Sequence, residues 1–455
     1  MVLLFACVQA EASGLSRQIN AIVSRKDYVK ADFAVRIIKA DSGKTVYSRQ
    51  AKKLMIPASN MKIVTSAAAI AYLEPNYTFR TKVGMRGNDL VVIGGGDPLL
   101  GDKSNDQKHS RKAGWIFDDI IAGLKEKNFS WVNNIVVDST FFDDMRVHPS
   151  WPAANLNQPY SCEVSGINYN DNCLRLTVRR DDSRAVIIVD PHTNFLKLIN
   201  KVNLVSSGNT VFGAYRNSKP NVLIVKGKCR KEGGADIAIE NPAMMFGTML
   251  NERLARAGIE ISGSVIEKYA GHVGKVDVFR TYETPMSDVL MRCNKDSLNM
   301  AAEALVKTIS AEYTKGKING QWKHGCELIG KYLATLGISA DQYKLDDGCG
   351  LSRENRISAN VLVGVLRNIY NSGAWGEYKK SLAIGGVDGT IRKYFKDEKY
   401  KGKIIGKTGY INGVRTFSGV AQTDGGDYIF SILTSGGTAT VRTGINDIAK
   451  AIIDN

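Results

Sequence analysis

The stretch PASNMKIVTSAAAIAYL, residues 57–73, decides the fold. Its second half has no glycine or proline and is almost wholly apolar, which predicts a helix buried on most sides. Ser59 and Lys62 stand three positions apart at the start of this helix, so they lie on one helical face. A lysine that is desolvated loses its charge more easily, and its neutral amine could then take the proton of the serine hydroxyl. Alone this S-x-x-K pattern is weak evidence, but its place before so apolar a helix strengthens it.

Two further short patterns carry side chains suited to the same chemistry. In Ser297-Leu298-Asn299, the hydroxyl could relay a proton between Lys62 and a leaving amine, and the amide could hold a substrate amide. In Lys407-Thr408-Gly409, on a predicted strand, the lysine and hydroxyl can bind a carboxylate, and the glycine leaves room for a peptide to lie alongside. Each also has a purely structural explanation. The first fits the polar start of a helix, and the second fits a basic edge strand that discourages aggregation.

The two ends of the chain read as one α+β body. Five strands are expected there, over residues 33–39, 44–49, 403–411, 414–423 and 428–435, with Asn412-Gly413 as the strongest turn signal between two of them. Helices are expected from Ser358, whose side chain can cap the first turn, and over 445–453. The middle offers short strands and one clear helix, capped by Asn241, and we read it as a β-rich insertion.

The composition excludes several classes of protein. With 455 residues, of which 44% are hydrophobic and 23% charged, the chain is globular rather than disordered or collagen-like, and no run of about 18 apolar residues predicts a membrane span. The net charge of +16 permits a polyanionic partner, but the basic residues are dispersed, which favours a solvated surface over a nucleic-acid groove.

The spacing of cysteine, histidine and glycine excludes other kinds of site. The seven cysteines and five histidines are scattered without a CxxC or HExxH pattern, so neither a zinc site nor a triad histidine is expected. The glycines at 94–96 do not complete a dinucleotide-binding pattern, because Leu99 stands where the last glycine would be needed. Gly406 does not complete a phosphate loop, because Lys401 occupies the place of its first glycine. A general base is therefore expected to be Lys, Asp or Glu.

In this order, S-x-x-K, S-x-N and K-T-G form the motif set of penicillin-binding proteins and serine β-lactamases. The chain resembles the low-molecular-mass class C penicillin-binding proteins, which are D-alanyl-D-alanine carboxypeptidases with DD-endopeptidase activity. The resemblance runs from about Ser24 to the C-terminus through the blocks VIGGGDPLL, DGCGLSRENRIS, IGGVDGTIRKYF and GKTGYINGVRTFSGV. The long gap between Ser59 and Ser297 is similar to that of the class C group and unlike that of the compact β-lactamases.

The resemblance implies a penicillin-recognising serine transpeptidase/β-lactamase-like fold, an antiparallel sheet flanked by helices. It implies a discontinuous catalytic domain over 13–80 and 277–455. A large β-rich domain is expected between them over 81–276, with a smaller nested domain around 165–240.

The resemblance also assigns roles to the motif residues. Ser59 would form the acyl-enzyme, Lys62 would be the acylation base and Ser297 the proton shuttle. Substrate binding would use Asn299, Lys407, Thr408 and Gly409, and the backbone N–H groups of Ser59 and Tyr410 would form the oxyanion hole. No metal or organic cofactor is implied. The implied partners are peptidoglycan peptides and, as covalent inhibitors, β-lactam antibiotics; nucleic acid is not among them.

Three positions depart from the family pattern. Tyr410 stands where relatives carry Ser or Thr, so a hydroxyl contact to substrate is lost or moved and the ring could narrow the cleft. Cys349 replaces a serine and reads as a small buried residue. Asn155 lies near the place where some relatives hold an acid for the side-chain amine of the substrate.

The N-terminal segment bears on export, and two other functions fit parts of the same sequence. Residues 1–12 are a possible signal segment, which predicts export to the periplasm or cell envelope. The apolar run is nevertheless short and lacks a basic leader. A β-lactamase or esterase on the same fold shares Ser59 and Lys62. A non-catalytic peptidoglycan-binding protein is the alternative that Tyr410 motivates.

Overall fold

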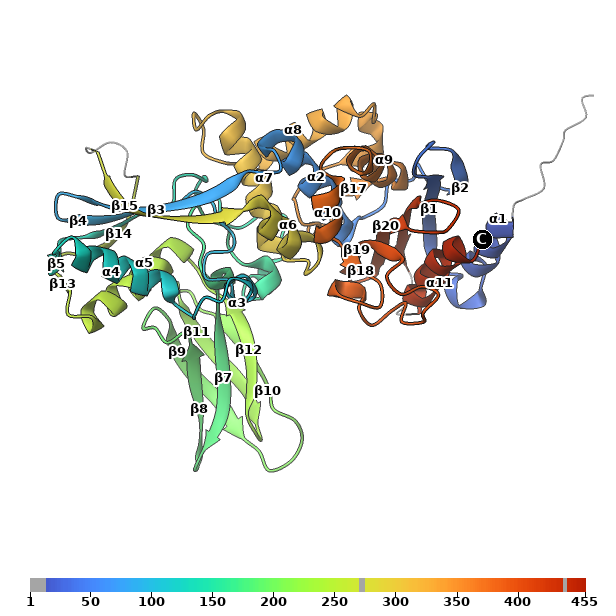
Figure 1. Ribbon diagram of the computed structural model, residues 1–455. Helices are drawn as coiled ribbons and strands as arrows, with labels where there is room; N and C mark the ends of the chain where they lie inside the picture. Colours follow the sequence, from blue (N-terminus) through green and yellow to red (C-terminus); the bar gives the residue numbers. More distant parts are fainter. Residues whose placement is uncertain (1–13, 270–274, 437–439) are drawn as a thin grey trace, which may run out of the picture.

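A six-stranded antiparallel sheet, in the order β18-β19-β20-β21-β1-β2, forms the end of the molecule that holds both described termini (Figure 1). The computed structural model describes residues 14–269, 275–436 and 440–455. The strands are β1 (Asp32–Lys39), β2 (Thr45–Arg49), β18 (Ala383–Ile384), β19 (Ile404–Ile411), β20 (Val414–Ala421) and β21 (Tyr428–Ser435). Strand β1 pairs with β21 along its whole length, so the first and last parts of the chain share one sheet.

Helices cover both faces of this sheet because its strands alternate apolar side chains between two cores. Phe33, Val35 and Ile37 of β1 pack with α1 (Gly14–Val23) and α11 (Val441–Asp454). Ala34 and Ile38 pack on the other side, in the largest core. That core is built by α2 (Met61–Leu73), α6 (Met286–Asn294), α7 (Asn299–Tyr313), α8 (Trp322–Thr335), α9 (Ala359–Tyr370) and α10 (Trp375–Ser381).

The insertion begins and ends as one antiparallel strand pair, β3 (Thr78–Arg86) and β15 (Asp277–Pro285). These strands belong to a five-stranded sheet, β14-β6-β4-β3-β15, with β4 (Asp89–Ile93), β6 (Ile135–Asp138) and β14 (Val265–Glu267). Helices α4 (Trp115–Glu126) and α5 (Pro242–Arg256) pack into its core. The sequence analysis places residues 277–285 in the catalytic part, whereas their strand is hydrogen-bonded into the sheet of the insertion.

Two three-stranded sheets project from this body in the lower part of Figure 1. One is β12-β7-β8, formed by β7 (Cys173–Asp181), β8 (Arg184–Asp190) and β12 (Gly233–Ala238). The other is β10-β11-β9, formed by β9 (Lys197–Leu204), β10 (Val211–Arg216) and β11 (Val222–Cys229). The remaining short elements are α3 (Lys103–Lys108), the parallel pair β5 (Trp131–Val132) and β13 (Glu260–Ile261), and the pair β16 (Tyr343–Lys344) and β17 (Arg356–Ile357).

The expected strands and helices at the two ends of the chain are present within a few residues of their predicted bounds. Asn241 and Ser358 cap α5 and α9, accepting hydrogen bonds from the backbone N–H groups of Met244 and Val361. Helix α4 is absent from the predictions because it follows Gly114, which has a positive φ and offers no capping side chain.

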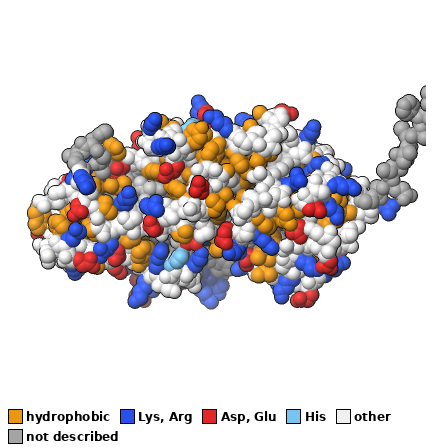
Figure 2. All heavy atoms as spheres, turned by 45° about the horizontal axis from the view of Figure 1, so that its top comes forward, with side chains coloured by type: hydrophobic (Ala, Val, Ile, Leu, Met, Phe, Trp, Pro, Cys, Tyr) orange, Lys and Arg blue, Asp and Glu red, His pale blue; other side chains and the backbone are white. Residues whose placement is uncertain are grey.

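Three expectations from the sequence concern the surface and the N-terminus. Lys and Arg side chains are spread over the face drawn in Figure 2 rather than gathered in one patch. None of the described helices has the length and apolar character needed to span a membrane. The possible signal segment, residues 1–12, lies outside the described residues.

Candidate active site

Ser59 lies in a short 3-10 turn, Ala58–Asn60, directly before α2. Strand β20 fixes this turn through buried hydroxyl groups. Thr416 Oγ1 lies 2.9 Å from the carbonyl oxygen of Pro57 and 2.6 Å from Asn60 Oδ1. Asn60 Nδ2 in turn donates to Ser418 Oγ at 2.6 Å. The position of Ser59 is therefore set by a strand that lies more than 350 residues further along the chain.

Two non-glycine residues at this site have left-handed backbone conformations. Ala58 has φ of 46° and Ser297 has φ of 65°. Such conformations cost on the order of 1–3 kcal/mol and persist only where the surrounding structure enforces them. Gly350, with φ of 82°, approaches so closely that an added Cβ would lie 1.8 Å from the carbonyl oxygen of Ala58. The backbone beside the nucleophile candidate is thus held between β20 and the loop that contains Gly350.

Lys62, in the first turn of α2, is fully buried beneath Ser59. Its Nζ lies 3.1 Å from Ser59 Oγ, 2.6 Å from Asn299 Oδ1 and 3.0 Å from the carbonyl oxygen of Cys349. All three partners are uncharged oxygen atoms. Among the described residues, no carboxylate forms an ion pair with Lys62. The S-x-x-K contact expected from the spacing is present, and two further oxygen atoms orient the amine.

Lys407 on β19 is a second fully buried lysine at the site. Its Nζ donates to Ser297 Oγ at 2.8 Å and to the carbonyl oxygen of Thr408 at 2.9 Å. Burial, and then the charge of Lys62, hold the pKa of Lys407 well below its ordinary value. Ser297 Oγ thus accepts a hydrogen bond from Lys407, while the hydrogen bonds of Lys62 go to Ser59, Asn299 and Cys349.

Asn299, the first residue of α7, joins the insertion to the site. Its Oδ1 accepts from Lys62, and its Nδ2 donates to the carbonyl oxygen of Tyr160 at 2.7 Å. The sequence analysis assigns this amide to a substrate. In the structure one of its two N–H groups is already engaged by the protein, and the second is the one left for a ligand.

Strand β19 is an edge strand where it passes Ser59. Strand β18 pairs only with Ile405 and Gly406, so over residues 407–411 the outer side of β19 has no strand partner among the described residues. A Cβ on Gly409 would lie 2.1 Å from Thr416 Oγ1 and 2.9 Å from the backbone nitrogen of Ser59. The sequence analysis reads Gly409 as room for a substrate strand, whereas the space its side chain would fill is occupied by the protein.

A cavity of about 660 Å³ opens between these elements. Ser59, Ser297, Asn299 and Tyr410 line it, together with residues of the insertion and of the loop that follows β16. These further lining residues include Ser150, Pro152, Asn155, Tyr160, Leu351 and Arg353. The ring of Tyr410 is 60% exposed and lies under the guanidinium of Arg415, whose central carbon is 4.4 Å from the ring centroid. Tyr410 therefore forms part of the cavity rim instead of filling the cavity.

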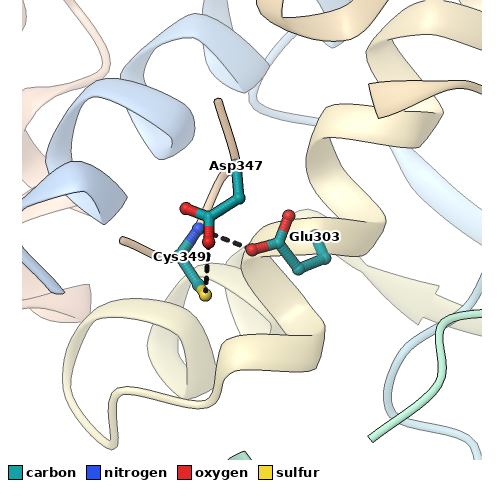
Figure 3. A group of neighbouring side chains, drawn as sticks. All are labelled: Glu303, Asp347 and Cys349. Carbon is teal, nitrogen blue, oxygen red and sulfur yellow. Dashed lines mark hydrogen bonds between the residues drawn. The ribbon is translucent and has the colours of Figure 1, made fainter. Parts of the chain in front are cut away.

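Glu303, Asp347 and Cys349 form a buried group of acidic and thiol side chains (Figure 3), and the carbonyl oxygen of Cys349 contacts Lys62. Glu303 accepts hydrogen bonds from the backbone N–H groups of Cys349 at 2.7 Å and Gly348 at 2.9 Å, and from Trp322 Nε1 at 2.7 Å. Asp347 accepts from the backbone N–H groups of Gly350 at 2.7 Å and Ser352 at 2.6 Å, and from Trp151 Nε1 at 3.0 Å. The carboxylate oxygens of both Glu303 and Asp347 are therefore already hydrogen-bonded to N–H groups of the protein.

This group holds the loop whose carbonyl contacts Lys62. Because Glu303 binds the N–H of Cys349, it fixes the peptide that presents the Cys349 carbonyl to the amine. Burial raises the pKa of Glu303, and the charge of Asp347 raises it further. Cys349 itself is buried, as the sequence analysis expects, and burial raises the pKa of its thiol well above the ordinary value.

The sequence analysis missed Thr416, Ser418 and Glu303 as residues that position the site. Thr416 and Ser418 carried a usable signal, because two hydroxyl residues two positions apart in an apolar central strand point to one face. Glu303 carried a weaker one: it lies four positions after Asn299 on α7 and is fully buried in an otherwise apolar stretch of that helix.

Comparisons with known proteins show the family and the fold of the chain. The model of the D-Ala-D-Ala carboxypeptidase 3 (S13) family matches residues 15–453. A D-alanyl-D-alanine carboxypeptidase from Actinomadura sp. (strain R39) is 26% identical, with 96% of this chain and 85% of the relative covered. The crystal structure of penicillin binding protein 4 from Haemophilus influenzae has a TM-score of 0.82 at 20% identity, over 96% of this chain and 98% of the other. That protein in complex with a β-lactam has a TM-score of 0.77 to this chain, again at 20% identity and over the same shares.

The structural likeness confirms the expected penicillin-recognising serine enzyme fold. The family match confirms the resemblance that the three motifs indicated. Since this match spans nearly the whole sequence, the chain belongs to the D-Ala-D-Ala carboxypeptidase 3 (S13) family and is a serine-type carboxypeptidase.

Proposed function

We propose that the chain cleaves D-alanyl-D-alanine and cross-link peptide bonds of peptidoglycan through an acyl-enzyme on Ser59, and that β-lactams acylate the same hydroxyl. The observation that carries this proposal is the buried amine of Lys62, 3.1 Å from Ser59 Oγ. A serine hydroxyl is a weak nucleophile until a neighbouring base removes its proton.

The three contacts of Lys62 support its role as acylation base. A neutral amine has two N–H groups and one lone pair. The two N–H groups have acceptors in Asn299 Oδ1 and the Cys349 carbonyl, which leaves the lone pair facing the hydroxyl of Ser59. The proton of Ser59 would pass to this lone pair as the hydroxyl oxygen attacks the substrate carbonyl.

The remaining motif residues would bind substrate and move the proton. Lys407 and Thr408 would hold the terminal carboxylate, Gly409 would let β19 approach Ser59, and Asn299 would bind a substrate amide. Ser297 would carry a proton to the leaving amine. The backbone N–H groups of Ser59 and Tyr410 would form the oxyanion hole, where one donor is typically worth about 3 kcal/mol.

The proposal extends to partners and place. Peptidoglycan stem peptides carry free carboxylates, which a protein of net charge +16 attracts. An enzyme with this substrate would work in the periplasm or elsewhere in the cell envelope, where β-lactams would reach it as covalent inhibitors.

Labelling with a fluorescent penicillin tests the proposal. The wild type should acquire one label per chain, and Ser59→Ala should acquire none, because the attacking oxygen is gone. Ser42→Ala is the matched control, since Ser42 lies in the exposed turn between β1 and β2. Labelling that persists in Ser59→Ala would refute the assignment, and rapid nitrocefin turnover without a stable adduct would favour a β-lactamase instead. Binding of cell-wall fragments without cleavage would favour a non-catalytic protein.

A further inference from the structure

Another hollow, of about 470 Å³, lies beside Thr408, whose hydroxyl contacts Thr390 in the wall of the hollow. It is lined by residues around α6 and by the loop after β18, which contribute Arg292, Lys295, Asp296, Thr390, Arg392 and Lys393. Its lining is dominated by charged side chains, in contrast to the largely uncharged cavity beside Ser59.

Two contacts make the hollow a neighbour of the catalytic cavity. Thr390 lines the hollow, and its Oγ1 lies 2.9 Å from Thr408 Oγ1. Asp296 lines the hollow, while the next residue, Ser297, lines the cavity. A ligand whose carboxylate sits at Thr408 therefore has the hollow directly beyond that carboxylate.

The charges of the hollow fall into two groups. Arg292 is committed to Asp102 at 2.7 Å and Asp296 at 2.8 Å, and Lys295 is committed to Asp388 at 2.7 Å. Arg392 and Lys393 are exposed and form no ion pair with any described residue. The hollow thus presents two uncommitted cations and the hydroxyl of Thr390 to solvent.

The orientation of a bound substrate determines which part of it would reach these cations. The catalytic cavity extends along Tyr410, Ile411 and Asn412, which places the acyl part of a substrate on that side of Ser59. Lys407 and Thr408 then face the leaving part. In a carboxypeptidase reaction the leaving part is one amino acid, which ends at the carboxylate that Lys407 and Thr408 would hold. In cross-link cleavage it is a second stem peptide with carboxylates of its own.

We propose that the hollow between α6 and residues 389–394 binds the leaving strand of a cross-linked substrate, an acidic peptide, through Arg392, Lys393 and Thr390. This inference rests on the proposed function, since it assumes acylation of Ser59. It adds binding and no new chemistry: the amide bond that breaks and the amine that leaves are those of the proposed reaction. Its consequence is that the hollow favours endopeptidase over carboxypeptidase turnover.

The test compares two substrates on one enzyme. The double variant Arg392→Ala/Lys393→Ala should lower the ratio of kcat/KM for a purified cross-linked stem-peptide dimer to kcat/KM for a monomeric pentapeptide by roughly fivefold, as expected for two exposed charge pairs. The matched control is Lys396→Ala, an exposed lysine of the same loop that does not line the hollow, and its ratio should equal that of the wild type.

Salt gives an independent measurement. Dimer cleavage by the wild type should fall more steeply with ionic strength than pentapeptide cleavage, and the double variant should lose that difference. An unchanged ratio, an equal loss on both substrates, or a wild type that cleaves only the pentapeptide would overturn the inference. Loss of penicillin labelling in the wild type would instead refute the proposed function, so the two failures are distinguishable.

Discussion

Two fully buried lysines, one on helix α7 and one beside its first residue, lie in different surroundings. Lys307, in its third turn, lies 2.7 Å from Asp143 Oδ1 and 2.8 Å from the carbonyl oxygen of Met145, with its Nζ 4.3 Å above the ring of Trp322. Lys62, beside the first residue of α7, has only neutral oxygen partners and faces a second lysine, Lys407.

The difference suggests separate roles for the two lysines: Lys307 would stabilise the fold, and Lys62 would act as the base of the proposed reaction. A carboxylate and an aromatic ring partly compensate the charge of Lys307 and tie the insertion to α7, although burial lowers the pKa of this lysine. At the catalytic cavity no such compensation is present in the described part of the chain, and two amines share one buried region. A base must lie within hydrogen-bond reach of the proton that it takes, and the Lys62 amine meets this condition at 3.1 Å from Ser59 Oγ.

The largest effect is expected for Lys62→Met. This variant keeps much of the side-chain volume and removes the amine, so the rate constant of penicillin acylation should fall about 10³-fold, within the range for loss of a general base. Stopped-flow measurement with a fluorescent penicillin gives that rate constant. An acylation rate close to that of the wild type would show that another group is the base.

Lys307→Met should lower the stability of the protein and leave the acylation rate unchanged. Removing this amine leaves Asp143, about one quarter exposed, without its partner, so the free energy of unfolding should fall by about 2 kcal/mol. Acylation of the folded enzyme should proceed at the wild-type rate. Urea unfolding measures the first quantity, and the double variant with Asp143→Asn should lose less than the sum of the two single variants. A slow acylation rate in Lys307→Met would remove the distinction between the two lysines.

Lys407→Met should change the pH dependence of stability. Because the pKa of Lys407 is lowered in the folded state, the unfolded chain binds more protons between that lowered pKa and the ordinary value of 10.5. The contribution of Lys407 to stability therefore rises with pH across this window, by at most about 1.4 kcal/mol per pH unit. Urea unfolding between neutral pH and pH 10 should show a shallower rise in the variant. Equal slopes would contradict the lowered pKa.

Local sequence patterns were sufficient for the parts of the molecule that depend on neighbouring residues. The contact between Ser59 and Lys62 follows from helical spacing, and the β19–β20 hairpin follows from Asn412-Gly413. The order of the three motifs was sufficient for the family.

The partners of these residues could not be derived in the same way, because they depend on long-range packing. Lys62 takes acceptors from Asn299 and Cys349, which lie 237 and 287 positions away. Ser297 turns toward Lys407 from a left-handed backbone conformation that no local signal indicates. The hollow beyond Thr408 arises where residues 292–296 and 389–394 meet, and neither segment alone suggests a binding surface.

Residues 150–160 of the insertion form one side of the catalytic cavity, and the Tyr160 carbonyl holds the amide of Asn299. A shortened chain that kept all three motifs but lacked residues 81–276 would lose this wall of the cavity and the carbonyl that holds the Asn299 amide. If the proposed site is correct, the middle part of the chain supplies one wall of it, and a chain trimmed of that part should not bind substrate as the whole chain does.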